Sequence, residues 1–472
     1  MMNREPDASR LSARQLEILE LVSKGCSNPE IAELLHLSLN TVKTHIANIL
    51  KTLHVSNRIE ASVWFEQYTR QQTADHRKLQ LFIRTQDFPV GTSGSALHSV
   101  VDLLSRWELL QVHFVSDMRL PETVNSGHEF YCLTLRYQRS EGIDQLVPDL
   151  QYFEPLQISG VMIWQGMPIP LQSPPQTLLL RKSGTVFNKV IANHATVHKG
   201  MSDAVSRGYE VIYTTEYKIK HRTPAHMKEV RELLKQQLPS HPDWALLNAY
   251  SVMALYAGIV EGYFPITPEL MEELAVSAQK ACNLMPDSAY SRLAFSLHCL
   301  LQSRFADAAE HIELALEANP ALEFALFLVG QIAALNGHYD EAKNHYQNYL
   351  EIYPEGHHSG RCYAGLTVVH YLAGEFDTCK QTAEKALLYN QTIQAGVCMI
   401  LLSIAVMEED KAQQQELLGR LTAIMKDNPL KVINLEQLVM RIVPPDHAKA
   451  FVANMEKAGI VLSALIKPES EQ

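Results

Sequence analysis

Lysine, threonine and asparagine side chains recur at helical spacing between Ser38 and Arg58. On a helix, Lys43, Thr44 and Asn48 would share one face. Ammonium groups, hydroxyls and amides are the donors that phosphate oxygens and base edges accept. The chain carries 52 acidic and 41 basic residues, yet the interval 34–59 contains no aspartate or glutamate. A helix free of negative charge in an acidic protein predicts contact with a polyanion.

Apolar residues of the same segment repeat on the opposite face. The stripe consists of Val42, Ile46, Ile49, Leu50 and Leu53. This spacing is typical of an amphipathic helix with one buried side. We expect the stripe to pack on two preceding helices, through Leu16, Leu19, Ile31 and Leu34. The polar face would then point to the solvent.

Capping residues divide the interval 11–68 into four short helices. The side chains expected to cap them are Ser12, Ser27, Ser38 and Asn57. Three of these have a Gln or Glu three positions later, which is the spacing of a capping box. Because only the short turn "HLS" separates the second helix from the third, the two form an expected helix-turn-helix.

The run "LSARQLEILELVSKGCSNPEIAELLHLSLNTVKTHIANILKTLHVSNRIEA" resembles the DNA-binding domain of LuxR/FixJ-type transcription regulators. The resemblance implies that Lys43, Thr44 and Asn48 face the major groove. It also implies a set of phosphate contacts, made by Ser27, Asn28, Thr41, His45 and Lys51. Relatives often carry a polar or basic residue where this chain has Ala47, which implies a different preferred DNA sequence.

The fourth expected helix carries its own apolar stripe. The stripe is formed by Ala61, Trp64, Phe65 and Tyr68. Members of the resembled family often dimerise through this helix, so the stripe is a candidate dimer surface. Packing within the domain explains it equally well, and both interpretations remain open at the level of sequence.

The hydrophobic period changes after a polar linker at 69–78. Alternating or continuous apolar runs predict strands at 79–83, 109–115, 128–138 and 157–165, and helices at 95–107 and 185–208. We therefore expect an α/β domain at 79–215, followed by a linker or helix at 216–242. The segments "LLSRWELLQVHFVS" and "FYCLTLRYQRSEG" resemble the α/β module that precedes helical repeats in CadC/HilA-type regulators.

Prolines mark an internal repeat in the last part of the chain. Pro286, Pro320 and Pro354 follow one another at intervals of 34 residues, the length of a helix–turn–helix repeat. Between the last two, small and aromatic residues occupy the positions that such a repeat needs: Gly330, Gly337, Tyr339, Ala342 and Tyr346. The pattern resembles tetratricopeptide repeats, and we expect repeats with capping helices at 243–465. Their groove could hold a protein or peptide partner.

The sequence gives no sign of an enzyme or of a cofactor. It lacks the phosphate-binding G-x-x-x-x-G-K-[ST] loop and the G-x-S-x-G nucleophile motif. His194 and His198 are spaced to share a helical face, but no third metal ligand is evident near them, so we expect no metal site. The seven cysteines are scattered without a C-x-x-C pair, which fits a reducing cytoplasm.

These features predict a multidomain, mainly α protein. After a disordered N-terminus (1–10) it would have a four-helix helix-turn-helix domain (11–68), a middle α/β domain and a C-terminal TPR-like solenoid. The most apolar stretch, Trp244–Val260, has only 17 residues, whereas a bilayer span needs about 20, so we expect no contact with a membrane.

The expected function is a cytoplasmic transcription regulator. It would bind double-stranded DNA as a homodimer, read its sequence with the helix Leu39–Leu53, and respond to a ligand or protein partner of the other domains. The alternative is a TPR-based protein-interaction scaffold whose helix-turn-helix serves for docking. Salt-dependent binding to duplex DNA would separate the two.

Overall fold

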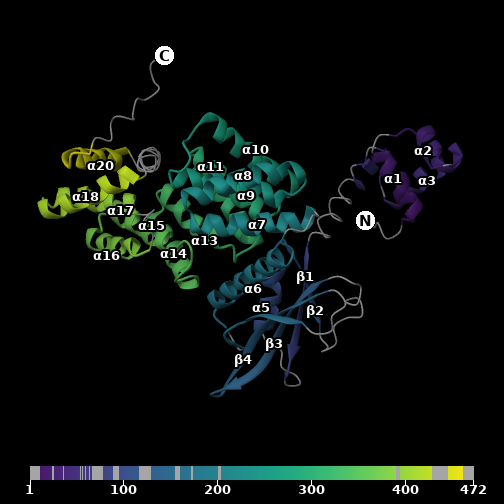
Figure 1. The fold of residues 1–472 in the computed structure, drawn as a ribbon, viewed down its shortest axis with the longest axis horizontal. Helices are drawn as coiled ribbons and strands as arrows, with labels where there is room; N and C mark the ends of the chain where they lie inside the picture. The colour runs from purple at the N-terminus through teal and green to yellow at the C-terminus, as the bar shows by residue number, and fades with distance from the viewer. Residues whose placement is uncertain are drawn as a thin grey trace, which may run out of the picture. The chain divides into compact units, whose positions relative to one another are not determined.

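The structure is a computed structural model of the 472-residue chain (Figure 1). It describes residues 11–23, 26–35, 37–53, 55, 57–58, 60–62, 64–65, 78–88, 95–115, 129–154, 160–171, 174–199, 204–389, 394–427 and 445–460. The chain divides into two compact units, Met1–Leu79 and Gln80–Gln472.

The N-terminal unit is built from α1 (Ala13–Ser23), α2 (Asn28–Leu34), α3 (Leu39–Thr52) and a helical segment within 58–65. Helices α1 and α2 both pack on α3. The buried core joins all four segments, through Leu11, Ile18, Leu19, Val22, Ile31, Val42, Ile49, Leu53 and Ala61. The expected helix-turn-helix is therefore present, and its core is the stripe inferred from the sequence.

One expected core residue of this unit is exposed. Leu34 leaves 59% of its surface exposed, whereas Leu35 and Leu37 pack against the core. The reason is helical phase, because the side chains of neighbouring residues on a helix point about 100° apart, and the core takes Leu35. The side chain of Leu16 lies outside the described part of the chain.

The caps expected from the sequence shape the helix termini. Ser38 Oγ accepts a hydrogen bond from the Thr41 amide at 3.1 Å. Asn57 Oδ1 accepts one from the Glu60 amide at 2.9 Å. Such bonds satisfy amides that have no partner in the first helical turn.

The second unit begins with a six-stranded mixed sheet in the order β2-β1-β3-β4-β5, with β6 paired to β4. The strands are β1 (Leu79–Gln86), β2 (Leu110–Val115), β3 (Phe130–Ser140), β4 (Ile143–Phe153), β5 (Val161–Gln165) and β6 (Ile169–Pro170). Strands β1 and β3 are parallel, and β3 and β4 form an antiparallel hairpin. Helix α5 (Ser95–Ser105) packs on β2, α6 (Gln176–Val197) packs on β5, and the two helices contact each other, so they cover one face of the sheet (Figure 1).

The rest of the unit is an array of paired helices. The elements are α7 (Ala204–His221), α8 (Pro224–Gln237), η3 (Leu238–Ser240), α9 (Ala245–Val260), α10 (Pro268–Leu284), α11 (Ala289–Leu301), α12 (Phe305–Ala318), α13 (Glu323–Leu335), α14 (Tyr339–Ile352), α15 (Ser359–Leu372), α16 (Phe376–Leu387), α17 (Gln394–Met407), α18 (Lys411–Asp427) and α20 (Pro445–Lys457). Helices from α7 to α18 pack as consecutive pairs, and α20 packs on α17. No described helix is both long and apolar enough to cross a bilayer.

A residue in the left-handed backbone conformation lies in the turn between the two helices of each pair. The residues with positive φ at these turns are Arg222, Gly262, Ser303, Gly337, Gly374 and Glu409. The three prolines of the sequence pattern each stand two residues beyond the second helix of a pair, after α10, α12 and α14. The repeat architecture expected from the proline spacing is thus confirmed, in agreement with the mainly α fold class.

Several expected boundaries differ from the structure. The expected helix at 185–208 is two helices, α6 and α7. The expected domain boundary at 215 falls inside α7, and the segment 216–242 consists of the end of α7, α8 and η3, which pack with α9 as the start of the helical array. The residues around Arg222 ("KHRTPAH", 220–226) are polar and resemble a linker, so the sequence gives no sign that the array has already begun.

Candidate nucleic-acid interface and ligand sites

Helix α3 presents a polar face to the solvent. Val42 and Ile49 are buried to 1% exposure or less and anchor the opposite side of the helix. The exposed residues of the polar face are Lys43, Thr44, Ala47, Asn48 and Lys51, and Thr41 and His45 flank it half-buried. The structure therefore brings together six of the eight predicted DNA-binding residues on one helix.

Hydroxyl groups of this face are partly engaged within the helix. Thr44 Oγ1 donates to the carbonyl of Asn40 at 2.9 Å, and the hydroxyls of Ser38 and Thr41 lie 2.7 Å apart. These bonds fix the side-chain rotamers at the start of α3. The Thr44 hydroxyl proton is thus committed to the backbone, and its oxygen can still accept, since a hydroxyl can donate one bond and accept two.

The other two predicted residues lie at the start of α2. The amide of Ser27 donates to Glu30 Oε2 at 2.6 Å, as in a capping box. Asn28 Oδ1 accepts from Arg58 Nη1 at 3.2 Å, which leaves the amide group of Asn28 to donate. Arg58 also donates to the carbonyl of Cys26. The sequence gives Arg58 no visible link to Asn28, because the two lie 30 positions apart.

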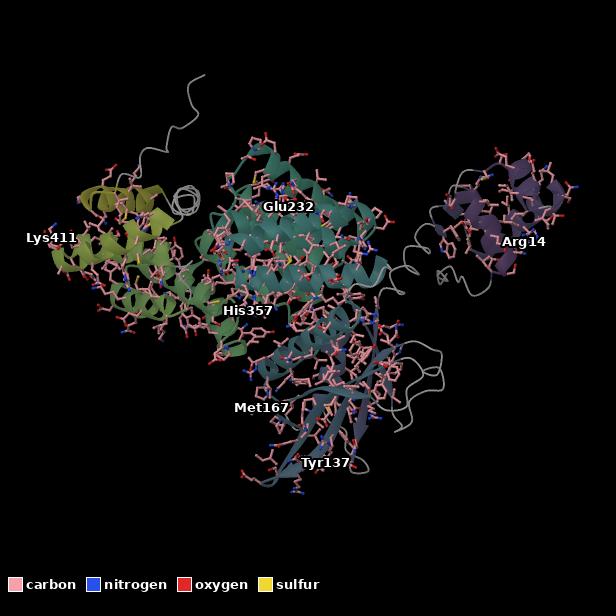
Figure 2. All side chains as sticks on the ribbon, in the orientation of Figure 1. Arg14, Tyr137, Met167, Glu232, His357 and Lys411 are labelled. Atoms are coloured by element: carbon pink, nitrogen blue, oxygen red, sulfur yellow. The ribbon has the colours of Figure 1, made fainter. Side chains whose placement is uncertain are left out.

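Hydrogen bonds at the ends of α2 hold two charged side chains of this unit in place. Hydrogen bonds from the side chain and backbone of Ser27 lower the pKa of Glu30. Its negative charge is thereby held at the start of α2, where it complements the helix terminus. A second arginine, Arg14 on α1 (Figure 2), donates to the carbonyl of Leu35 at 2.5 Å and closes the end of α2.

The predicted dimer stripe divides between core and surface. Ala61 is 2% exposed and belongs to the domain core. It cannot contribute to a dimer surface in this conformation, because its methyl group already contacts the domain's own side chains. Trp64 and Phe65 are half-buried and pack against the same core, and Tyr68 lies outside the described residues.

Comparison with known proteins gives this unit a family. Residues 9–65 match the family described as bacterial regulatory proteins, luxR family. The N-terminal domain is a luxR-family domain. Over 58 residues the chain is 47% identical to the response regulator protein VraR of Staphylococcus aureus strain Mu3, and equally so to that of Staphylococcus epidermidis. The aligned part is 12% of this chain and 28% of each relative, so the likeness to VraR is confined to the luxR-family domain.

Two solved structures match the chain over longer stretches, each at low identity. The Rap protein complexed with competence and sporulation factor matches with a TM-score of 0.37, 13% identity, and coverage of 61% of this chain and 82% of that chain. The Cut9 complex with Hcn1 matches with a TM-score of 0.37, 12% identity, and coverage of 61% and 53%.

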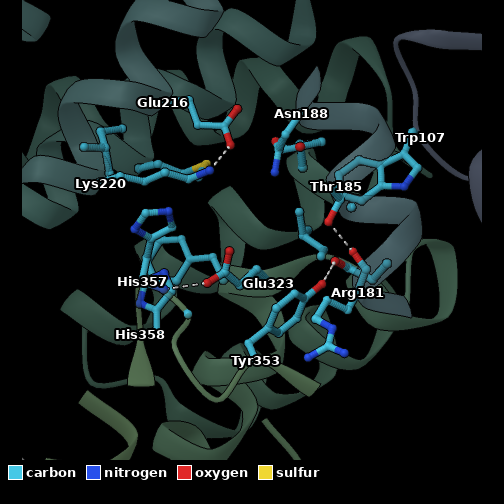
Figure 3. A pocket seen from close by; sticks show the side chains of 18 of the residues that line it. Trp107, Arg181, Thr185, Asn188, Glu216, Lys220, Glu323, Tyr353, His357 and His358 are labelled. Carbon is cyan, nitrogen blue, oxygen red and sulfur yellow. Dashed lines mark hydrogen bonds and ion pairs between the residues drawn. The ribbon is translucent and has the colours of Figure 1, made fainter. Parts of the chain in front are cut away.

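A cavity of about 260 Å³ lies in the second unit where α6 meets the helical array (Figure 3). Its wall includes Arg181 and Thr185 of α6, Glu216 and Lys220 of α7, and Glu323 of α13. This cavity, which the sequence did not predict, joins segments more than 100 residues apart. No short motif could therefore have revealed it.

Opposite charges alternate around the cavity. Lys220 lies 2.6 Å from Glu216 Oε1; burial opposes its charge, but the neighbouring Glu216 raises the pKa of Lys220 overall. Glu323 Oε1 accepts hydrogen bonds from the Tyr349 hydroxyl at 2.6 Å and the His357 amide at 2.9 Å. Burial, assisted by Lys220, lowers the pKa of His357. The wall thus offers fixed charges and neutral donors to a small polar molecule.

The histidine pair of α6 has a third neighbour that the sequence did not reveal. Glu129, the residue before β3, lies with its carboxylate against both His194 and His198. Burial opposes the charge of Glu129, but the neighbouring imidazole of His194 and the hydroxyl of Tyr152 lower its pKa to about 2. The sequence separation of more than 60 residues explains why no motif was visible.

Proposed function

We propose that this chain is a sequence-specific DNA-binding transcription regulator whose recognition helix is α3. The observation that carries the proposal is the exposed, acid-free polar face of α3 in a luxR-family domain. The lysine ammonium groups and the Asn48 amide supply the donors that phosphates and base edges require, and the Thr44 oxygen can accept. Carboxylates on that face would instead repel the DNA backbone, and the helix has none.

The proposed contacts follow from the position of each side chain. Lys43, Thr44 and Asn48 are exposed on successive turns of α3 and are assigned to base edges in the major groove. The flanking donors are assigned to phosphates: Ser27, Asn28, Thr41, His45 and Lys51. A helix that enters the groove places its side residues near the backbone on either edge, which supports this division.

We assign dimerisation on DNA to the fourth helical segment. Trp64 and Phe65 retain partly exposed aromatic surface there, and aromatic residues are enriched in the centres of interfaces. Tyr68, on the same stripe in the sequence, completes the proposed surface. A dimer would double the number of base contacts and fix the spacing of two half-sites.

We assign control of DNA binding to the second unit. The charged cavity beside α6 supports a small polar ligand as the signal, because binding sites are typically concave with a few fixed polar groups. The array of helical pairs supports a protein partner as the other possible signal. Either signal changes the DNA-binding state only through a difference in its affinity for the two states.

The test is selection of DNA fragments by the purified full-length protein, followed by fluorescence anisotropy with the selected duplex. We expect the logarithm of the binding constant to fall linearly with the logarithm of the salt concentration, because phosphate contacts release counterions. Lys43→Ala should lower the affinity, whereas Lys228→Ala, which removes the same charge from an exposed position on α8, should not.

The scaffold alternative makes the opposite prediction. A helix-turn-helix used only for protein docking would enrich no DNA sequence, and any weak binding would be equal for all fragments. That result, obtained with protein shown to be folded, would overturn the assignment of α3 as a recognition helix.

A further inference from the structure

Three side chains from two distant segments meet at the C-terminal end of α6. His194 and His198 lie four positions apart and share one face of the helix end. Glu129 Oε2 lies 2.6 Å from His198 Nε2, and Glu129 Oε1 lies 3.1 Å from His194 Nδ1. One nitrogen from each histidine and one carboxylate oxygen lie within 4.8 Å of one another.

The buried histidine of this cluster lacks a satisfied ring nitrogen. His194 is only 4% exposed, and its Nδ1 forms no aligned hydrogen bond with any described group, despite the nearby Glu129 oxygen. A hydrogen bond weakens steeply as its angle departs from linearity, so this contact satisfies the buried nitrogen only in part. The nitrogen faces the carboxylate, and the His198 ring lies beside that of His194, with 4.3 Å between ring centroids.

Surrounding residues hold the three donors in place. The Tyr152 hydroxyl of β4 donates to Glu129 Oε2 at 2.6 Å. The ring of Tyr209 packs edge-on against His194, with 4.7 Å between centroids. Metal-binding carboxylates and imidazoles are commonly oriented by such outer partners.

We propose that Glu129, His194 and His198 form a binding site for Zn²⁺. Two imidazole nitrogens and one carboxylate oxygen are a donor set that zinc accepts in tetrahedral geometry. Zinc bonds to these donors are about 2.0–2.2 Å long, which places any two ligands about 3.4 Å apart. The two nitrogen–oxygen distances of 2.6 and 3.1 Å would open slightly on binding, and the widest separation among the three donor atoms, which is at most 4.8 Å, would close.

The donor chemistry also selects among cations. Mg²⁺ and Ca²⁺ prefer sites made only of oxygen ligands, so the two imidazoles favour zinc or a similar transition ion. The fourth position would be open to water or another small ligand. His198 and Glu129, with side chains 15% and 22% exposed, provide access from the solvent.

Occupation of the site would join the start of β3 to the end of α6. The opposite end of α6 carries Arg181 and Thr185 of the charged cavity. The ion would therefore fix a helix that borders a second site, and this proposal stands whether or not the chain binds DNA.

The experiment uses tag-free, full-length protein freed of metal by chelation. Zinc is titrated in competition with a chromogenic chelator, and Co²⁺ is added separately because its absorption reports tetrahedral coordination. We expect one tight zinc equivalent, an intense visible Co²⁺ band without sulfur-to-metal charge transfer, and no competition by Mg²⁺.

Two variants remove ligands with little change of volume, His198→Gln and Glu129→Gln. Changes to outer partners of a metal site weaken binding by about 10–100-fold, so loss of a ligand should have at least that effect. His221→Gln is the matched control, because His221 is an exposed histidine on α7 away from the cluster. Circular dichroism confirms that each variant is folded.

Any one of three results would overturn the proposal. The first is that the wild-type protein fails to bind zinc, and the second is that both ligand variants bind zinc as tightly as the wild type. The third is that the Co²⁺ spectrum shows sulfur coordination. The first two would mean that the cluster is a hydrogen-bonded triad alone, and the third that the ion prefers the cysteines.

Discussion

Arg58 reaches across the N-terminal domain and donates to Asn28 Oδ1 at 3.2 Å. It also donates to the carbonyl of Cys26, so it ties the fourth helical segment to the turn that leads into α2. Both contacts are partly buried, where a hydrogen bond from a charged group contributes about 1.5–3 kcal/mol. The position of a predicted phosphate contact therefore depends on an arginine outside the recognition helix.

Arg58→Ala should destabilise the N-terminal domain by about 1.5–3 kcal/mol. DNA affinity should fall for all sequences alike, because Arg58 positions Asn28 and reads no base. Urea denaturation of residues 1–79, in which Trp64 is the single tryptophan, measures the stability, and anisotropy with matched and scrambled duplexes measures the affinity. Arg58→Lys keeps the charge but not the two-pronged geometry, so it should rescue little. A changed order of sequence preference would show that Arg58 contacts bases.

Lys43→Ala should relax sequence preference at one base position and cost about 1–3 kcal/mol there. Lys43 is exposed near the start of α3, opposite the buried Val42. Lys51→Ala is the matched comparison, since it removes an exposed lysine from the same helix but at a proposed phosphate contact. It should weaken all sequences equally and reduce the salt slope by about one. Equal loss across sequences for Lys43→Ala would reassign that residue to the backbone.

The stability of the N-terminal domain should depend on Glu30 below neutral pH. Bonds from Ser27 lower the pKa of Glu30 in the folded state relative to the unfolded state. Its contribution is therefore fully present above the unfolded pKa and is lost as the pH falls through the folded one. Urea midpoints of residues 1–79 across the acidic range should show this loss, and Glu30→Gln should flatten it. An unchanged pH profile in the variant would exclude Glu30 as its source.

The helical pairs should respond differently to two glycine-to-alanine changes. A Cβ atom at Gly330 would lie 2.9 Å from the ring of Tyr346, whereas one at Gly419 would meet nothing within 4 Å. Gly330→Ala should therefore destabilise the second unit, because crowding in a packed core costs about 1–3 kcal/mol. Gly419→Ala, in the exposed middle of α18, should stabilise it by about 0.5–1 kcal/mol. Thermal denaturation compares them, and equal shifts would contradict the packing seen between α13 and α14.

Helix boundaries could be predicted from the sequence where a residue type acts only on its neighbours in the chain. Prolines that stop a helix and side chains that cap one act on their own neighbours, so Pro320 and Ser38 could be interpreted directly. Strand β4 was missed because Pro148 and two aspartates interrupt its apolar pattern. In the sheet, Pro148 lies between the part of β4 that pairs with β5 and the part that pairs with β6, where its missing amide hydrogen costs little.

Contacts between segments that are distant in the chain could not be predicted from the sequence. The polar face of α3 was visible because its members lie within a dozen residues of one another. Glu129 could not be assigned to His194, nor Glu323 to Lys220, because only the tertiary packing of α6 and α7 on their neighbours brings them near. Leu34 shows a smaller error of the prediction. It was expected in the core, but it is exposed, and the next residue, Leu35, packs there instead.

The last prediction concerns control by the second unit. Asn188 is an exposed residue of α6 that lines the charged cavity, and its neighbour Lys189 is exposed on the same helix outside the lining. Asn188→Trp should fill the cavity without disturbing the core, because its side chain leaves the helix toward open space. If a small polar ligand in this cavity biases the DNA-binding state, the variant should bind the same DNA sequence but lose the response to growth conditions. Lys189→Trp adds the same bulk beside the cavity and should respond like the wild type.

The fragment of residues 1–75 should also retain the sequence preference and lose regulation, because a ligand cannot shift the DNA-binding state through a site that is absent. A reporter assay in the native host compares the four proteins at equal abundance. A wild-type response from Asn188→Trp under every condition would remove the cavity as the control site and leave the groove of the helical pairs, with a protein partner, as the place where the signal acts.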